Sequence, residues 1–441
     1  MTVVEFSVIL PTGDHLMLPG LTPSEKIVAS LSENAFLKLW THPNPIGKKG
    51  KELCDCLVVC GPHIIIISVK EIKYKKKIVT EDGEEKDVGL ERWTKTAIEK
   101  SMAQIWGAER WLEEVDKVER HDKQVITLPP KNERQYHRVA IALGSKGQIP
   151  MAWGNHKNGY VHVFDEYSLD IVFGVLDTIT DFVNFLIAIE TLKCRMVFAG
   201  GGIEDLVALY LRNGYSFGID PKENMLIFGD NIWKSFSENG ELNEMKNELS
   251  ISYNWDDLIE YFSDKLLSGK ILDLYNSKLI EKVEKEHNNQ FALAEMALQP
   301  RGYRANLAEA FKDFLYQPEH KYSSRCVIGY NGTAFVFSFG SSDNRTARRN
   351  ELALRCLIVR GRWQNVTTVV GISTDRPEPE MEEASEDIVY LDIPVWTDEL
   401  EKTVEDAQAK FGYFRNMKKS STLIKRRPKF KIPKSKKKKR R

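Results

Sequence analysis

Two apolar runs that meet at Gly61-Pro62 constrain the fold of this chain more than any other feature. Residues 53–60 have the length of a strand, and residues 64–72 begin with four consecutive isoleucines. β-branched side chains at this density favour a strand that is buried on both faces. A Gly-Pro pair between two such runs is typical of a turn. The sequence therefore predicts a central β-hairpin.

Helix signals stand on either side of this hairpin. Residues 22–25 (TPSE) combine a threonine cap, a proline at the first helical position and a glutamate three residues after the cap, which is a strong helix start. We expect that helix to run to about Trp40, and a long amphipathic helix to cover residues 90–118. The charged segment 73–87 is expected to be a solvated excursion.

Length and element order together indicate the fold class. At about 150 residues per domain, 441 residues favour two or three domains. The pattern predicts an α/β fold, with a mixed N-terminal sheet flanked by helices over residues 1–165. A mainly helical domain is expected over 166–290, an α+β domain over 291–416, and a basic disordered tail over 417–441.

The second and third regions carry no chemical motif, but their elements can be placed. Helical periodicity covers 169–192, 203–211 and 255–267, and a further helix is expected from 291 to 315. Asn331-Gly332, at the centre of residues 326–339, is the strongest short hairpin signal in the chain. A helix at 345–358, strands near 366–372 and 388–392, and a helix at 399–411 are expected to follow.

Composition and the N-terminal residues favour a soluble protein. Apolar residues make up 42% of the chain and charged residues 29%, values typical of globular proteins. Residues 1–10 lack a basic leader, and no window reaches the roughly 18 apolar residues of a membrane span. We therefore expect a cytoplasmic protein without membrane contact. The oligomeric state is left open, a homodimer included.

Cysteine usage fits a reducing compartment, because six cysteines in a chain of this length do not form the dense pattern of a secreted scaffold. Disulfides are not expected. Cys54, Cys56 and Cys60 lie close together, which raises the question of a zinc site. Zinc ligands usually occur as Cys-x2-Cys on a tight turn, whereas alternate residues of a strand share one face. We interpret the three as small buried hydrophobic residues.

The charge of the chain is unevenly distributed although its formal net value is zero. Residues 418–441 contain fourteen basic residues and no acidic one. Clustered lysines and arginines bind nucleic-acid phosphates by releasing counterions. The same composition also fits a disordered solubilising tail or a nuclear localisation signal. The candidate nucleic-acid contacts are Lys436, Lys437, Lys438, Lys439, Arg440 and Arg441.

A regular register about Gly61-Pro62 pairs residues whose numbers sum to 123, which places Asp55 opposite Ser68. Alternation then puts Lys70 on the same face as Ser68, one diagonal step from Asp55. A carboxylate inside an apolar strand is costly unless it is paired or binds a metal. By the same register, Glu52 and Glu71 are expected to face each other on the opposite side of the sheet.

This arrangement resembles the PD-(D/E)xK nuclease superfamily, in which an acidic residue on one strand is followed on the next by an acid-x-Lys triplet. Asp55 matches the first acid, and Ser68-Val69-Lys70 matches the triplet with serine at the second acid position. Glu25 matches the helical carboxylate that is frequent in the superfamily. The helix-hairpin-helix order of residues 22–115 matches as well, so the resemblance covers about a fifth of the chain.

The resemblance implies a restriction-endonuclease-like domain and Mg²⁺- or Mn²⁺-dependent cleavage of DNA, in restriction or anti-phage defence. It assigns the metal to Asp55 and Glu25 and the attacking water to Lys70. Gln104 matches polar residues found on the helix after the hairpin in relatives.

Other interpretations stay open. Glu25 is also explained by the capping box, and Asp55 by a buried ion pair with Lys70. Because serine replaces the second acid, the alternative is a catalytically decayed module that binds nucleic acid or supports assembly. In a third hypothesis the region 291–416 is the effector, and the nuclease-like module only targets it.

Overall fold

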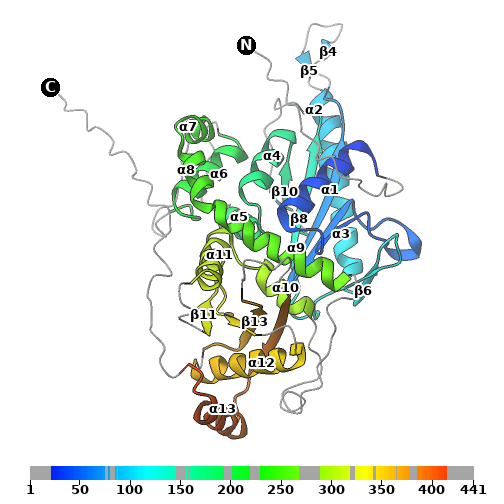
Figure 1. Ribbon diagram of the computed structural model, residues 1–441. Coiled ribbons are helices and arrows are strands. Elements are labelled where there is room, and N and C mark those ends of the chain that lie inside the picture. Colours follow the sequence, from blue (N-terminus) through cyan, green and yellow to red (C-terminus); the bar gives the residue numbers. More distant parts are fainter. Residues whose placement is uncertain are drawn as a thin grey trace, which may run out of the picture.

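A computed structural model describes residues 21–74, 78–79, 85–86, 88–145, 154–156, 158–192, 201–218, 229–267, 289–317, 323–340, 344–363, 365–376 and 385–414. The predicted α/β fold class is confirmed. A mixed N-terminal sheet with helices on both faces is followed by a layer of helices and by a second sheet with its own helices (Figure 1).

The N-terminal sheet is built around the predicted hairpin of β2 (Cys56–Cys60) and β3 (His63–Glu71). Its strand order is β1-β2-β3-β8-β10-β9, where β3, β8 and β10 run parallel. The predicted register is confirmed where Val59 pairs with Ile64. The remaining strands of this sheet are β1 (Thr41–Pro43), β8 (Gln135–Leu143), β9 (Gly154–His156) and β10 (Gly159–Phe164).

Strand β3 is buried on both faces, as the isoleucine run predicts. Ile65 and Ile67 pack in one hydrophobic cluster with α1 (Pro23–Phe36). Ile64 and Ile66 pack on the opposite face against the long helix of residues 88–112. That helix consists of α2 (Val88–Trp93), a π-helical turn (Thr94–Glu99) and α3 (Lys100–Leu112).

Two predicted helix ends lie too far along the chain. The first helix was expected to reach Trp40 but ends at Phe36, because Leu37 adopts a left-handed φ of 68° and turns the chain toward β1. The helix over 90–118 ends at Leu112, and the chain then forms a small hairpin of β6 (Lys117–Glu119) and β7 (Val125–Thr127). Strands β4 (Ile78–Val79) and β5 (Glu85–Lys86) pair within the segment expected to be a solvated excursion.

Two long predicted helices are each divided. The helix over 169–192 is split into α4 (Glu166–Val175) and α5 (Ile179–Leu192), and the Thr178 side chain accepts the N–H of Asp181 at the new start. The helix over 291–315 is split into α10 (Asn289–Ala297) and α11 (Arg301–Leu315) at Pro300, whose ring nitrogen cannot continue the hydrogen-bond ladder. The layer is completed by α6 (Ile203–Arg212), α7 (Ile232–Glu238), α8 (Glu241–Leu249), a 3-10 turn (Ser250–Ser252) and α9 (Tyr253–Leu267).

The C-terminal sheet has the order β11-β12-β13-β14. The hairpin predicted at Asn331-Gly332 is confirmed, and Gly332 adopts a φ of +86° in its turn. Helix α12 (Arg345–Arg362) connects the parallel strands β12 and β13, and α13 (Asp398–Phe411) packs against α12. The strands are β11 (Ser324–Ile328), β12 (Ala334–Phe339), β13 (Thr368–Thr374) and β14 (Glu386–Asp392).

One hydrophobic cluster joins all three regions, since it contains Val28 below the first sheet, Trp255 in the helical layer and Phe337 in the second sheet. Figure 1 shows the helices α9, α10 and α11 at the level between the two sheets. Arg301 and Arg304 of α11 both bind Asp256 of α9 in this buried layer. The described regions therefore pack through a shared interior, and the predicted boundaries at 165 and 290 stay a prediction.

Cys54, Cys56 and Cys60 are buried free thiols, which confirms the prediction that they are small core residues.

In the described part of the chain, no helix is long and apolar enough to cross a membrane.

Candidate active site

The candidate site lies where the β2–β3 hairpin opens. The antiparallel ladder ends at the pair Cys56 and Ile67, and Asp55 occupies a bend just before β2. Its Oδ2 accepts a hydrogen bond from the backbone N–H of Val69 at 2.7 Å. The Nζ of Lys70 lies 3.5 Å from the same oxygen. The Asp55 side chain is 2% exposed and that of Lys70 is 32% exposed, so the lysine forms the solvent side of the pair.

A chain of polar contacts leads from Ser68 to a second carboxylate. The Ser68 hydroxyl donates to Oε1 of Gln104 at 2.8 Å. The amide nitrogen of Gln104 donates to Oε1 of Glu52 at 3.4 Å. The Glu52 carboxylate also lies close enough to that of Asp55 to raise its pKa. Five side chains from three segments of the chain therefore meet on one face of β3: Glu52, Asp55, Ser68, Lys70 and Gln104.

The position expected for Glu52 is wrong. The prediction extended a regular strand back to residue 53, but residues 46–52 form a separate small hairpin, in which Ile46 bridges to Glu52. Leu53 donates its N–H to the carbonyl of Pro45, and the chain bends at Asp55 before β2 begins. For the same reason Cys54 and Cys56, expected to share a face, pack in opposite hydrophobic clusters.

Glu71 does lie on the other side of the sheet. Its carboxylate accepts a hydrogen bond from the Ser24 hydroxyl at the start of α1. Glu25, the next residue along α1, closes a capping box, because its Oε2 accepts the Thr22 N–H at 2.8 Å. Within the described residues, no hydrogen bond or ion pair joins Glu25 to Asp55, Ser68 or Lys70.

Burial raises the pKa of the Asp55 carboxyl, and the neighbouring Glu52 carboxylate raises it further. The Lys70 ammonium and the Val69 N–H act in the opposite direction. Two carboxylates in contact repel each other when both are ionised, unless a proton or a cation lies between them. One lysine supplies only one compensating charge, so the pair is suited to a further cation.

The donor set fits a hard divalent cation. Mg²⁺ in proteins is typically bound by one or two carboxylates and retains several water ligands. Asp55 and Glu52 supply two carboxylates, and the Gln104 side chain holds the second one in place. No group of three or more His, Cys, Asp or Glu side chains suited to a metal occurs in the described ranges. The two-carboxylate set is therefore compatible with Mg²⁺ or Mn²⁺ and unlike a closed structural zinc centre.

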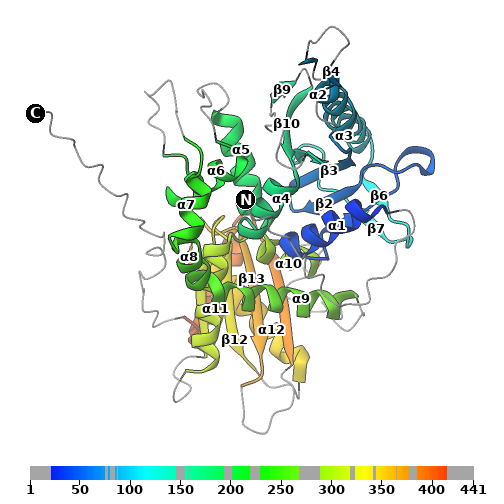
Figure 2. The ribbon, with the colours of Figure 1, turned by 90° about the horizontal axis from the view of Figure 1, so that it is seen from above.

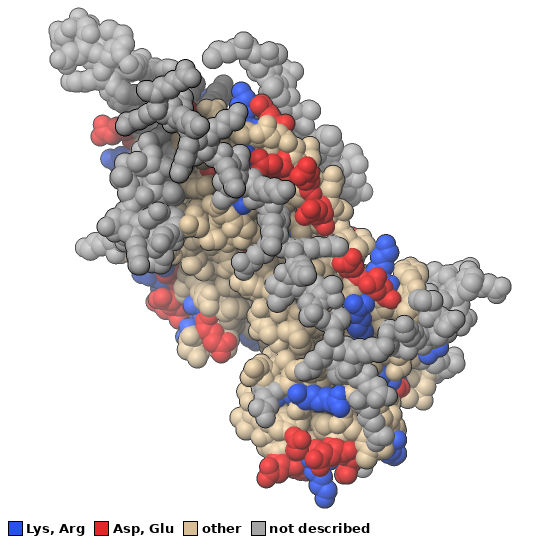
Figure 3. All heavy atoms as spheres, turned by 90° about the vertical axis from the view of Figure 1, so that its left-hand side faces the viewer, with Lys and Arg blue, Asp and Glu red and all other residues tan. Residues whose placement is uncertain are grey.

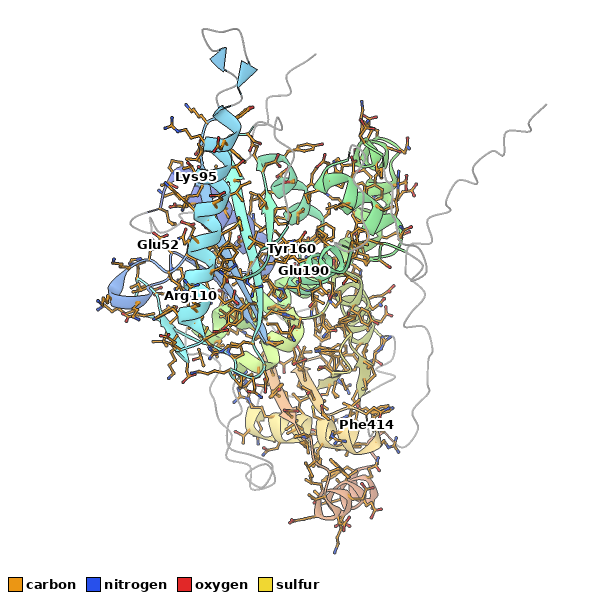
Figure 4. The ribbon with its side chains drawn as sticks, turned by 180° about the vertical axis from the view of Figure 1, so that it is seen from behind. Glu52, Lys95, Arg110, Tyr160, Glu190 and Phe414 are labelled. Carbon is orange, nitrogen blue, oxygen red and sulfur yellow. The ribbon has the colours of Figure 1, made fainter. Side chains whose placement is uncertain are left out.

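The long helix that carries Gln104 is fastened to β3. The indole N–H of Trp93 donates to the carbonyl of Ile72 at 2.8 Å, just beyond the end of the strand. The π-helical turn at 94–99 follows directly, and such turns are frequent at functional sites. Figure 4 shows Glu52 beside α3, at a level between Lys95 and Arg110. The Glu52 carboxylate and Gln104 therefore lie together along this helix.

Sequence reasoning identified four members of this constellation and missed Glu52. Gly47 and Gly50 flank Lys48 and Lys49 shortly before Glu52, and this was the available signal that the strand could not extend back through residue 52. The six candidate nucleic-acid contacts at 436–441 lie outside the described residues. Comparison with protein-family models, curated proteins and solved structures finds no match to this chain.

Proposed function

We propose that this protein is a Mg²⁺-dependent nuclease that hydrolyses phosphodiester bonds in DNA. The observation that carries the proposal is the convergence of Glu52, Asp55 and Lys70 at the open end of the central hairpin. Two carboxylates and a lysine on one sheet face form the chemical set that the PD-(D/E)xK resemblance implies. The cytoplasm, where restriction and anti-phage nucleases act, is the compartment that we propose for it.

Asp55 and Glu52 would hold the cation, which supplies Lewis-acid stabilisation of the charge that develops on phosphate oxygens. Lys70 is the partly exposed member of the site. Its ammonium group can orient a water molecule for in-line attack and stabilise negative charge at the phosphorus. The Val69 N–H holds the Asp55 carboxylate toward Lys70, so the two groups keep a fixed relation without substrate.

Ser68 and Gln104 act as positioning residues in this proposal. Ser68 is fully buried and holds the Gln104 amide, whose nitrogen then reaches Glu52. Ser68 thus helps to position the Glu52 carboxylate, although it supplies no carboxylate itself. Glu52 thereby supplies the second negative charge that the superfamily places at the position of Ser68.

A second candidate function is a nucleic-acid-binding or assembly module without catalysis. It is favoured by the same Ser68, whose hydroxyl is already engaged with Gln104. The two functions differ in metal dependence. Purified protein is incubated with plasmid, single-stranded DNA and RNA in Mg²⁺, Mn²⁺ or chelator. Cleavage of DNA that requires the metal supports the nuclease, and binding of DNA without cleavage in any metal supports the alternative.

A further inference from the structure

Three lysines stand on the small hairpin of residues 46–52, named here the lysine hairpin. Lys48, Lys49 and Lys51 are all exposed. No hydrogen bond or ion pair to another described residue engages their ammonium groups. Figure 2 shows this segment, between β1 and β2, projecting from the sheet beside β6 and β7.

The backbone of the lysine hairpin is well determined by hydrogen bonds. Gly47 donates to the carbonyl of Lys51 at 2.6 Å, and Gly50 donates to the carbonyl of Gly47 at 3.2 Å. Ile46 donates to the carbonyl of Glu119 in β6 at 2.8 Å, which fastens the base of the hairpin to a neighbouring strand. The lysines are therefore presented from a fixed turn and not from a free chain.

Two features of this turn raise its free energy, and an ordinary solvent-exposed loop would avoid both. Lys49 adopts a left-handed φ of 58°, which disfavours a residue with a Cβ by roughly 1 kcal/mol. The three ammonium groups lie within four residues of one another and repel each other. An anionic partner that binds them together offsets the repulsion.

The lysine hairpin leads directly into the candidate site. Lys51 precedes Glu52, and the four residue steps from Lys48 to Glu52 span at most about 14 Å of extended chain. A nucleic acid with a phosphodiester near Lys70 and Glu52 brings its neighbouring phosphates to the lysines. We propose that Lys48, Lys49 and Lys51 bind the sugar-phosphate backbone beside the scissile phosphate. This inference rests on the proposed function, because it takes nucleic acid as the ligand.

The surface around α13 is acidic, in contrast to the lysine hairpin. In Figure 3, which shows the left-hand side of Figure 1, acidic side chains gather at the lower end, where α13 lies. Helix α13 contributes Asp398, Glu399, Glu401, Glu405 and Asp406. A polyanion is repelled there, so α13 and the lysine hairpin favour different partners.

Binding of labelled duplex DNA is measured in chelator by fluorescence anisotropy over a range of salt concentrations, with labelled RNA duplex as a second arm. The variant is Lys48→Ala, Lys49→Ala and Lys51→Ala combined. Each phosphate contact contributes about 0.9 to the slope of log affinity against log salt for duplex DNA, so the slope should fall by about 2 to 3. Affinity at about 0.1 M salt should fall at least about tenfold.

The matched control removes three exposed lysines elsewhere: Lys234→Ala, Lys246→Ala and Lys402→Ala. It should keep the parent slope, and thermal melts establish that both variants are folded. An unchanged slope in the lysine-hairpin variant overturns the inference, even if the protein cleaves DNA. A parent that binds no nucleic acid overturns it as well. A parent that binds through these lysines but does not cleave in any metal supports the inference and contradicts the nuclease proposal.

Discussion

The Asp55 carboxylate accepts the backbone N–H of Val69 at 2.7 Å, so the bend before β2 is fastened to β3 between Ser68 and Lys70. This single contact fixes the first acid relative to the lysine, which lies 3.5 Å away. It also means that Asp55 has a structural role beside its proposed catalytic one. Substitutions at this position must therefore be chosen so that the two roles separate.

Asp55→Asn should abolish metal-dependent cleavage and largely preserve the fold. The amide oxygen can still accept from Val69, but it lacks the charge that attracts the cation. Asp55→Ala should in addition lose about 1 to 3 kcal/mol in the free energy of unfolding, because a buried N–H is left without an acceptor. Cleavage assays and urea melts of both variants measure the two effects. Cleavage by Asp55→Asn at the parent rate would exclude this carboxylate from the site.

Lys70→Ala should lower the cleavage rate by roughly 10² to 10³, the usual effect of removing one group that stabilises transition-state charge. Lys73→Ala is the matched control, because Lys73 is an exposed lysine just beyond the end of β3. Rates at saturating Mg²⁺ measure the difference. Equal activity in the two variants would show that Lys70 is only the ion-pair partner of Asp55.

Glu52→Gln should remove most of the rise in melting temperature caused by Mg²⁺, because the second carboxylate is lost while side-chain volume is kept. A cation bound only by the folded state raises stability in proportion to its affinity. Glu25→Gln is the informative control, since Glu25 caps α1 and Glu52 contacts Asp55. It should cost up to about 1 kcal/mol of stability and keep the Mg²⁺ response. If Glu25→Gln lost the Mg²⁺ response and Glu52→Gln kept it, the metal would be assigned to Glu25, as the family resemblance implies.

The contrast between Glu25 and Glu52 shows how much of the site could be predicted from the sequence. The turn at Gly61-Pro62, the register and the faces of Ser68 and Lys70 followed from the period of a regular strand. Gln104 came from the family resemblance, which implies a polar residue on the helix after the hairpin. Glu52 could not be found this way, because strand periodicity ends at the Asp55 bend and the position of residue 52 depends on the tertiary bridge to Ile46.

The same limit applies to the fold. Pro300 and Thr178 divide helices that hydrophobic periodicity alone reads as continuous, since periodicity does not detect a missing donor or a side-chain cap. The β6–β7 hairpin was missed because its strands are short, with only the central residue of each buried. The long buried strand β3 was predicted well, because packing and local propensity agree there.

The pH dependence of cleavage should show an acid limb above the usual range of aspartate. Burial raises the pKa of Asp55, with Glu52 adding to the shift, and only the ionised carboxylate attracts the cation. Activity should therefore fall as pH drops through this raised pKa. The free energy of unfolding changes in the opposite direction. Because the folded state binds the Asp55 proton more tightly than the unfolded state, this carboxyl stabilises the fold at low pH, and the contribution is lost as pH rises through the raised pKa. An NMR titration of the Asp55 carboxyl in the metal-free parent and in metal-free Glu52→Gln checks the shift, and the midpoint of the variant should lie at lower pH.

A separate pH effect is expected at the histidines of the central sheet. Burial lowers the pKa of His63 to about 4 and that of His137 to about 3, and the two rings are 3.1 Å apart between Nδ1 and Nε2. The unfolded chain binds protons at these positions below about pH 6.5. Stability is therefore complete above that pH and is lost as pH falls toward 4, by about 1.4 kcal/mol per pKa unit.

Urea melts from pH 7 to pH 4 measure this loss. His63→Gln combined with His137→Gln should make the free energy of unfolding less dependent on pH over that range. His121→Gln, at an exposed position, is the control and should leave the pH dependence unchanged. Parallel curves for the double variant and the parent would contradict a role for the buried pair.

Ser68→Glu restores the acid that the superfamily places at this position, and it should strengthen metal binding. The new carboxylate lies on the face of Asp55 and Glu52, so three carboxylates could share one cation. Without metal the variant should be less stable than the parent for two reasons. Ser68 is fully buried, so a larger side chain overpacks the site by about 1 to 3 kcal/mol. A further negative charge also raises the pKa values of its neighbours.

The matched control is Ser68→Gln, which has nearly the same volume as the glutamate without the charge. Both variants should lose the hydrogen bond to Gln104 and melt below the parent in chelator. Added Mg²⁺ should raise the melting temperature of Ser68→Glu more than that of the parent, because tighter binding to the folded state adds more stability. Ser68→Gln should respond to Mg²⁺ no more than the parent. If the glutamate and glutamine variants respond equally, Ser68 does not face a cation site, and the module without catalysis becomes the better account of this protein.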